Sequence, residues 1–148
     1  MIVLNKNINL YLFRSIAHYF QDIATTNSIT FYLRDTYNKS SEDDEFLELN
    51  VGNLKLEQLS HGYFRIDVPV VVVYSVDVSS NTQRDKEIQG ILVESFDQIC
   101  IYEYDSSGQG SYIESALPGD IIINDFGQIE QLKQGSVESL YSIYLKQD

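Results

Sequence analysis

The chain has few of the residues that build disulfides, metal centres and catalytic sites. Its 148 residues include one cysteine, two histidines and no tryptophan. Because Cys100 has no partner for an internal disulfide, the chain is typical of a reducing compartment. A zinc site needs three or four Cys or His ligands at short spacing, whereas His18, His61 and Cys100 are spread over more than half of the sequence. We therefore expect no metal and no cofactor.

Catalytic motifs are missing as well. Neither His18 nor His61 stands in a Ser, Cys or Asp pattern typical of a hydrolase, and Cys100 lies between two isoleucines of an expected strand. The glycines in residues 108–110 are too far from a helix start to cradle a phosphate. The acidic run at residues 42–45 lacks the alternating ligands and the glycine of an EF-hand loop. We expect a protein that is not an enzyme and works by contact.

Long hydrophobic runs are also absent. The longest one, residues 68–74, is far shorter than the ~20 apolar residues that a membrane-spanning helix needs. Residues 1–12 contain one lysine and no small-residue cleavage site, which is unlike a signal peptide. The sequence therefore predicts no contact with a membrane.

Basic residues are scarce, and the resulting charge is the most unusual bulk property. Ten Lys and Arg residues stand against 22 Asp and Glu residues, which gives a net charge of −12. A surface of this charge repels nucleic acids and anionic lipids. Three explanations stay open: a solubilising surface, a surface for a basic partner, and a wall past which DNA slides without binding.

The residues that are present predict one α+β domain over residues 1–148. Hydrophobic residues make up 43% of the chain, which is enough for a core at this length. Apolar residues at helical spacing predict helices at residues 8–25 and 79–96. Alternating apolar residues predict strands at residues 28–34, 46–59, 63–78, 98–104, 120–126 (continued by 128–133 as in a hairpin) and 137–145. The order α-β-β-β-α-β-β-β indicates a mixed, mostly antiparallel sheet packed by two helices.

The C-terminal segment fits two structures. In residues 137–145 the apolar side chains fit a helical spacing, yet Tyr141, Ile143 and Leu145 also alternate. Tyr and Ile favour strands, so we favour a strand here and keep the helix as the alternative.

The length of the third predicted strand suggests a projecting arm. The 16 residues from 63 to 78 would extend about 50 Å at ~3.3 Å per residue, whereas a domain of this size is only about 38 Å across. Either the strand bends at Pro69 or its first half leaves the body, as a hairpin arm over residues 46–68. Before it, residues 35–45 indicate a mobile acidic loop. The candidate contact residues of the arm are Leu47, Leu49, Leu54, Leu56, Tyr63 and Phe64.

The order of elements resembles that of tail terminator and neck proteins of long-tailed bacteriophages. The matching features are a leading helix over residues 10–24, a Val-rich strand at residues 70–74, and the polar residues 79–82 that open an amphipathic helix. Strands at residues 99–104 and 139–145 complete the likeness. The likeness covers nearly the full chain. It lies in the order of the elements and in their apolar or polar character, because no single residue motif defines the family.

This resemblance implies a non-enzymatic virion protein that is assembled in the host cytoplasm. Such proteins form a six-fold ring that ends the tail tube and joins it to the neck proteins, and the genome passes through the lumen. An acidic lumen would not bind the sliding DNA, although at physiological salt the repulsion reaches only ~8 Å. The candidate acidic residues facing the lumen or a partner are Glu42, Asp43, Asp44, Glu45, Asp85 and Glu87.

Two other hypotheses about the function stay open. Type III secretion chaperones are acidic proteins of similar length that bind an effector as dimers, and the chain resembles them equally if residues 137–145 form a helix. A DNA-mimic inhibitor would need carboxylates regularly spaced on one face, a pattern that the sequence does not show clearly.

Overall fold

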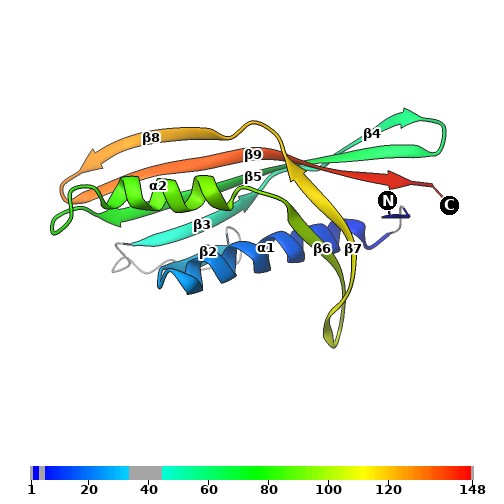
Figure 1. The fold of residues 1–148 in the computed structure, drawn as a ribbon, viewed down its shortest axis with the longest axis horizontal. Coiled ribbons are helices and arrows are strands. Elements are labelled where there is room, and N and C mark those ends of the chain that lie inside the picture. The colour runs from blue at the N-terminus through cyan, green and yellow to red at the C-terminus, as the bar shows by residue number, and fades with distance from the viewer. Residues whose placement is uncertain (1, 4–5, 34–44, 148) are drawn as a thin grey trace.

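A computed structural model describes residues 2–3, 6–33 and 45–147 of the chain. It confirms the α+β class, with a mostly antiparallel sheet packed by two helices (Figure 1). The elements are β1 (Ile2–Val3), α1 (Ile8–Thr26), β2 (Thr30–Leu33), β3 (Phe46–Val51), β4 (Lys55–Ser60), β5 (Tyr63–Asp77), α2 (Arg84–Ser95), β6 (Ile99–Asp105), β7 (Gly108–Pro118), β8 (Ile122–Ile129) and β9 (Leu132–Lys146).

Strands β5 and β9 form the central ribbon of the sheet. Each has 15 residues, and they pair antiparallel along their whole length, from Tyr63 opposite Lys146 to Asp77 opposite Leu132. On one side of β5 lie β4 and then β3, which continues to β2. On the other side, β1, the end of β7, and β8 pair with successive parts of β9. The ribbon therefore positions seven other strands (Figure 1).

The core lies between one face of the ribbon and the two helices. Every second residue of β5 and β9 points to this face, including Val72 and Tyr141, which are both fully buried. From α1 a stripe at i, i+4 spacing packs here through Leu12, Ile16 and Phe20, which is the geometry of an amphipathic helix on a sheet. The Phe96 ring, just after α2, contacts the rings of both Phe20 and Tyr141.

The C-terminal segment is a strand, as the favoured interpretation predicted, and the helical alternative is wrong. Alternation decided the outcome, because Tyr141, Ile143 and Leu145 all bury their side chains on the core face of the sheet. The buried hydroxyl of Tyr141 donates a hydrogen bond to the carbonyl oxygen of Asp97 at 2.8 Å, and burial raises the pKa of this tyrosine.

Other boundaries differ from the prediction. The expected strand at residues 46–59 is two strands, separated where Gly52 packs against the ring of Pro69. Strand β7 was not predicted, because its sequence is polar at its start and mostly exposed. The expected acidic loop at residues 35–45 lies outside the described residues except for Glu45.

The projecting arm exists, but it is built differently from the predicted hairpin. Strand β4 pairs with residues 63–67 of β5, and residues 142–146 of β9 pair with the same part of β5 from the other side. We call these three strand segments, with the turn at residues 61–62 and Gln147, the arm; it extends past both helices in Figure 1. Strand β3 pairs instead with residues 70–75 of β5. Leu47 and Leu49 are therefore buried in the body and do not belong to the arm.

Two glycines provide a matched test of this packing. A Cβ added at Gly135 of β9 would overlap the backbone oxygen of Asn124 and the hydroxyl of Tyr74, whereas one added at Gly90 of α2 meets nothing within 4 Å. We expect Gly135→Ala to lower the free energy of unfolding by about 1–3 kcal/mol, and Gly90→Ala to raise it by about 1 kcal/mol. Urea titrations of both variants measure this free energy. If Gly135→Ala left the free energy of unfolding unchanged, the packing described would be contradicted.

Candidate functional site

One hollow brings together side chains that often carry catalysis. Ser15, His18 and Asp22 of α1 and Cys100 of β6 line a cavity of about 320 Å³. The Ser15 hydroxyl accepts a hydrogen bond from the backbone N–H of Tyr102 at 2.9 Å. The His18 ring stacks on that of Tyr104, with centroids 5.5 Å apart.

The contacts in this hollow do not form a nucleophile and its base. Nucleophilic catalysis needs a base within hydrogen-bond reach of the nucleophile. Within the described part of the chain, no hydrogen bond joins His18 to Asp22, Ser15 or Cys100. His61 lies in the turn between β4 and β5. That the protein is not an enzyme stays a prediction.

Neither a metal site nor a membrane-spanning helix occurs among the described residues. In residues 2–3, 6–33 and 45–147, no three His, Cys, Asp or Glu side chains converge closely enough to hold a metal ion. Neither helix in that part of the chain is long and apolar enough to cross a membrane.

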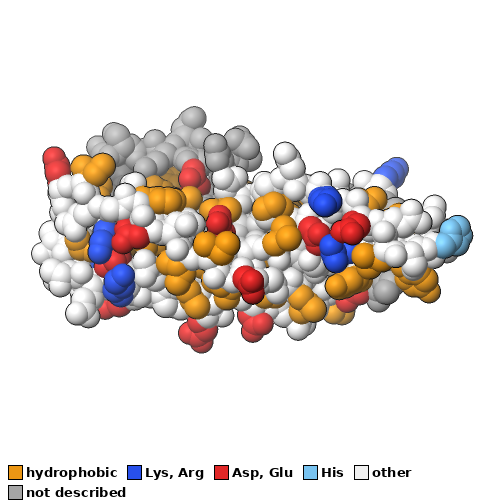
Figure 2. Space-filling view, turned by 90° about the horizontal axis from the view of Figure 1, so that it is seen from above, with side chains coloured by type: hydrophobic (Ala, Val, Ile, Leu, Met, Phe, Trp, Pro, Cys, Tyr) orange, Lys and Arg blue, Asp and Glu red, His pale blue; other side chains and the backbone are white. Residues whose placement is uncertain are grey.

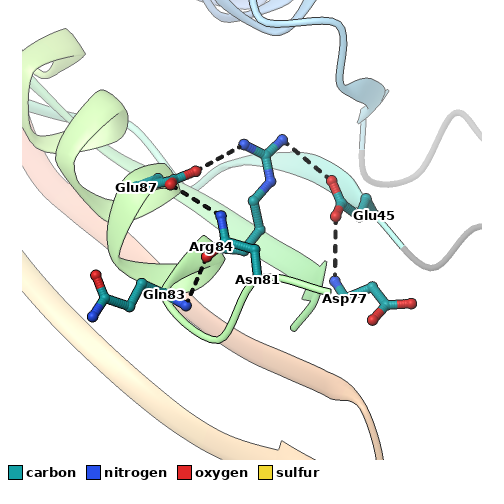
Figure 3. A network of polar contacts seen from close by, with 6 residues as sticks. All are labelled: Glu45, Asp77, Asn81, Gln83, Arg84 and Glu87. Atoms are coloured by element: carbon teal, nitrogen blue, oxygen red, sulfur yellow. Dashed lines mark hydrogen bonds and ion pairs between the residues drawn. The ribbon is translucent and has the colours of Figure 1, made fainter. Parts of the chain in front are cut away.

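Two of the candidate acidic residues are held in a network at the start of α2 (Figure 3). The guanidinium of Arg84 lies 3.3 Å from the Glu45 carboxylate and 3.4 Å from that of Glu87. Glu45 also accepts from the backbone N–H of Asp77, and Glu87 accepts from the side-chain amide of Asn81. The network joins β3, β5 and α2, so Glu45 and Glu87 serve a structural role, although Glu87 is exposed. Glu42, Asp43 and Asp44 lie outside the described residues.

Asp85 does not face a lumen or a partner, because only 2% of it is exposed. One of its carboxylate oxygens lies 3.1 Å from the Lys133 ammonium of β9, and the other has no hydrogen-bond partner among the described residues. The hydrogen bond to Asp85, and then its negative charge, raise the pKa of Lys133. Asp85 is therefore an anchor that ties α2 to the ribbon.

The face of the ribbon opposite the helices carries a groove. It has a volume of about 620 Å³ and is lined by β5, β9 and the start of β8. Its apolar lining includes Pro69, Val71, Ile122 and Leu140; Ile122 and Leu140 are 51% and 47% exposed. Figure 2 views the molecule from the β8 side and shows apolar side chains along the length of the molecule, with carboxylates among them. Sequence reasoning did not find this surface.

Of the remaining candidate contact residues of the arm, some are exposed to solvent and others pack on the core. Leu56 and Tyr63 are 50% and 49% exposed, whereas Leu54 and Phe64 are half-buried and pack on the core. Leu59, which the sequence did not single out, is also exposed, at 46%. The outer surface of the arm therefore combines apolar side chains with the exposed Lys55 and Lys146.

No protein-family model matches the chain, and no curated protein matches it either. A solved structure of a protein without a functional name is similar to it, with a TM-score of 0.56 and 10% sequence identity, over 90% of this chain and 94% of that one. At this identity the likeness shows the fold alone.

The pair formed by Asp85 and Lys133 predicts a pH-dependent effect. We expect Lys133→Met to lower the melting temperature near neutral pH, because it leaves a buried carboxylate without its cation. Lys133 contributes fully below its ordinary pKa of 10.5 and loses its contribution as the pH rises through its raised folded value. The difference from the natural protein should therefore shrink above that pH.

Lys86→Met is the matched control for this measurement. Lys86 lies 3.9 Å from the same carboxylate but is 63% exposed, so we expect a much smaller change. Thermal unfolding of both variants between neutral and alkaline pH checks the effect. Equal melting temperatures for the two variants would contradict the anchoring role of Asp85.

Proposed function

We propose that this protein is a non-enzymatic structural protein that assembles with copies of itself into a ring, as the resemblance to phage tail terminator and neck proteins implies. In this function the ring has six copies, ends the tail tube and joins it to the neck. The protein is then part of the virion, is assembled in the host cytoplasm, and has the tail tube and neck proteins as its partners.

The observation that carries the proposal is a pair of uncovered surfaces, the arm and the groove, that adjoin on one ribbon. Soluble monomers seldom expose large contiguous apolar patches. Here the arm exposes Leu56, Leu59 and Tyr63, and the groove exposes Ile122 and Leu140. Because the two surfaces differ, a contact between them is heterologous, and repeated heterologous contacts close into a ring when the rotation allows it.

The charge supports the same function. A net charge of −12 opposes DNA binding, which suits a passage that must release its polyphosphate. Asp85 cannot line such a passage because it is buried, whereas Glu42, Asp43 and Asp44 remain candidates. The type III secretion chaperone alternative depended on a C-terminal helix, and the segment is strand β9. No specific observation therefore favours it.

The first test is the oligomeric state of the purified full chain. We expect native mass spectrometry to give a mass of six copies and negative-stain microscopy to show rings with a central hole. The physical reason is that assembly removes the exposed apolar side chains from water. A monomer or a compact dimer at every concentration up to hundreds of micromolar would overturn the proposal.

The second test addresses DNA. We expect no retardation of a DNA duplex by the assembled protein in a gel, even at low salt of about 50 mM, where cationic binders hold DNA most tightly. A basic protein of similar size serves as the positive control. Retention that weakens as salt rises would show phosphate binding and would contradict the proposed passage.

A further inference from the structure

The floor of the groove and the arm belong to the same two strands. Arg65 and Asp67 of β5 line the groove and also stand at the base of the arm, and Ser142 of β9 lies opposite Asp67. The Asp67 carboxylate accepts hydrogen bonds from both Arg65 and Ser142, at 3.3 and 2.6 Å. Because continuous paired strands join arm and groove, the arm cannot fold back into the groove of its own chain.

The arm differs in charge from the rest of the chain. The arm carries the basic Lys55, Arg65 and Lys146 and the acidic Glu57 and Asp67, a net charge of +1 within a chain of −12. Arg65 is committed inside the arm, since its guanidinium lies 2.7 Å from Glu57 and 3.0 Å from Asp67. Lys55 and Lys146 are exposed and form no ion pair with any described residue.

The groove has the complementary composition. Pro69, Val71, Ile122 and Leu140 make its apolar lining, and Asp120 and Glu138 add two carboxylates. Neither carboxylate forms an ion pair with the described part of the chain, although Glu138 accepts a long hydrogen bond from Asn124 at 3.5 Å. Within the described residues, the arm thus offers exposed apolar side chains and two unpaired lysines, and the groove offers exposed apolar side chains and two unpaired carboxylates.

We infer that the arm of one copy docks in the groove of a neighbouring copy. Leu56, Leu59 and Tyr63 supply the apolar contact, and Lys55 and Lys146 pair with Asp120 and Glu138. The inference rests on the proposed function insofar as it requires self-assembly, and it names the two surfaces that assembly uses. Each copy offers one arm and one groove, so the contact is directional and repeats from copy to copy.

Two complementary variants of the full chain test this contact. The arm variant carries Leu56→Asp with Leu59→Asp, and the groove variant carries Ile122→Asp with Leu140→Asp. All four positions are 46–51% exposed, so both variants are expected to fold, as circular dichroism and thermal unfolding will show. The control carries Tyr112→Asp with Ile129→Asp, which are 54% and 79% exposed and lie outside both surfaces.

The expected result has three parts. Each variant alone stays monomeric at concentrations at least tenfold above those at which the natural chain assembles, and the control assembles as the natural chain does. An equimolar mixture of the two variants forms a 1:1 dimer and nothing larger, because one intact arm and one intact groove remain. Light scattering and native mass spectrometry measure these masses.

Each other outcome has one meaning. If the natural chain itself never assembles, both the proposed function and this inference fail. If it forms rings and either variant does so as well, the inference fails while the proposed function stands. If both variants are folded monomers and their mixture stays monomeric, the two surfaces do not meet each other and the inference fails.

A cross-linking experiment on the assembled protein gives an independent measurement. In a Cys100→Ser background, one chain carries Leu56→Cys and another carries Leu140→Cys. We expect oxidation of the mixture to give a disulfide-linked dimer of unlike chains at least tenfold faster than either chain alone. The matched pair Tyr112→Cys and Leu140→Cys should give no such enhancement, and equal rates for the two pairs would overturn the inference.

Discussion

The antiparallel pairing of β5 with β9 is the constraint on which the rest of the structure depends. Every strand except β2 and β6 pairs directly with one of these two, and both helices pack on one face of the ribbon. A slip of one residue would turn every buried side chain of a strand to the opposite face. If β9 slipped, Val137 and Tyr141, which lie opposite Val72 and Val68, would point away from the helices.

Pro69 shows how closely the neighbouring strands fit this ribbon. Proline has no backbone N–H and is poorly tolerated in a central strand. The carbonyl oxygen of Pro69 accepts a hydrogen bond from the backbone N–H of Gly52 at 2.8 Å. This bond lies between the part of β5 that pairs with β4 and the part that pairs with β3. The donor that proline lacks would point to the same side of β5 as this bond, at the junction of the two strands. Because the break between β4 and β3 lies opposite Pro69, the long strand β5 can contain a proline without leaving a backbone acceptor of a neighbouring strand unpaired.

Length explains why parts of the molecule stay uncovered. The 15 residues of β5 extend about 50 Å at ~3.3 Å each, whereas the 19 residues of α1 extend only about 28 Å at 1.5 Å each. The 12 residues of α2 are shorter still. Two helices of this length cannot cover such a ribbon, and both lie on one face. The arm and the groove are what the helices leave exposed.

The helices and most strands could be predicted from the sequence, because hydrophobic periodicity encodes them. The ion pairs and the groove could not, because contacts between distant residues create them. The sequence placed the strand at residues 63–78, the structure has β5 at Tyr63–Asp77, and both helices were found. It could not reveal that Asp85 is buried, because its partner Lys133 is distant in sequence, or that Arg84 holds Glu45. The groove combines β5, β8 and β9 and has no local motif. One signal was available: three consecutive isoleucines at residues 121–123 put apolar side chains on both faces of an edge strand.

Net charge and local charge act in opposite directions in the proposed assembly. Copies that each carry −12 repel one another, and at physiological salt this repulsion is screened beyond roughly 8 Å. The pairs that we infer between the arm and the groove would act at contact distance, where screening is weaker. Repulsion between bodies therefore disfavours random association, whereas the basic arm of one copy and the carboxylates of the next favour a single docking geometry. In this way an acidic protein can avoid binding DNA and still recognise itself, because two lysines that are unpaired among the described residues, Lys55 and Lys146, lie on the element that makes the contact.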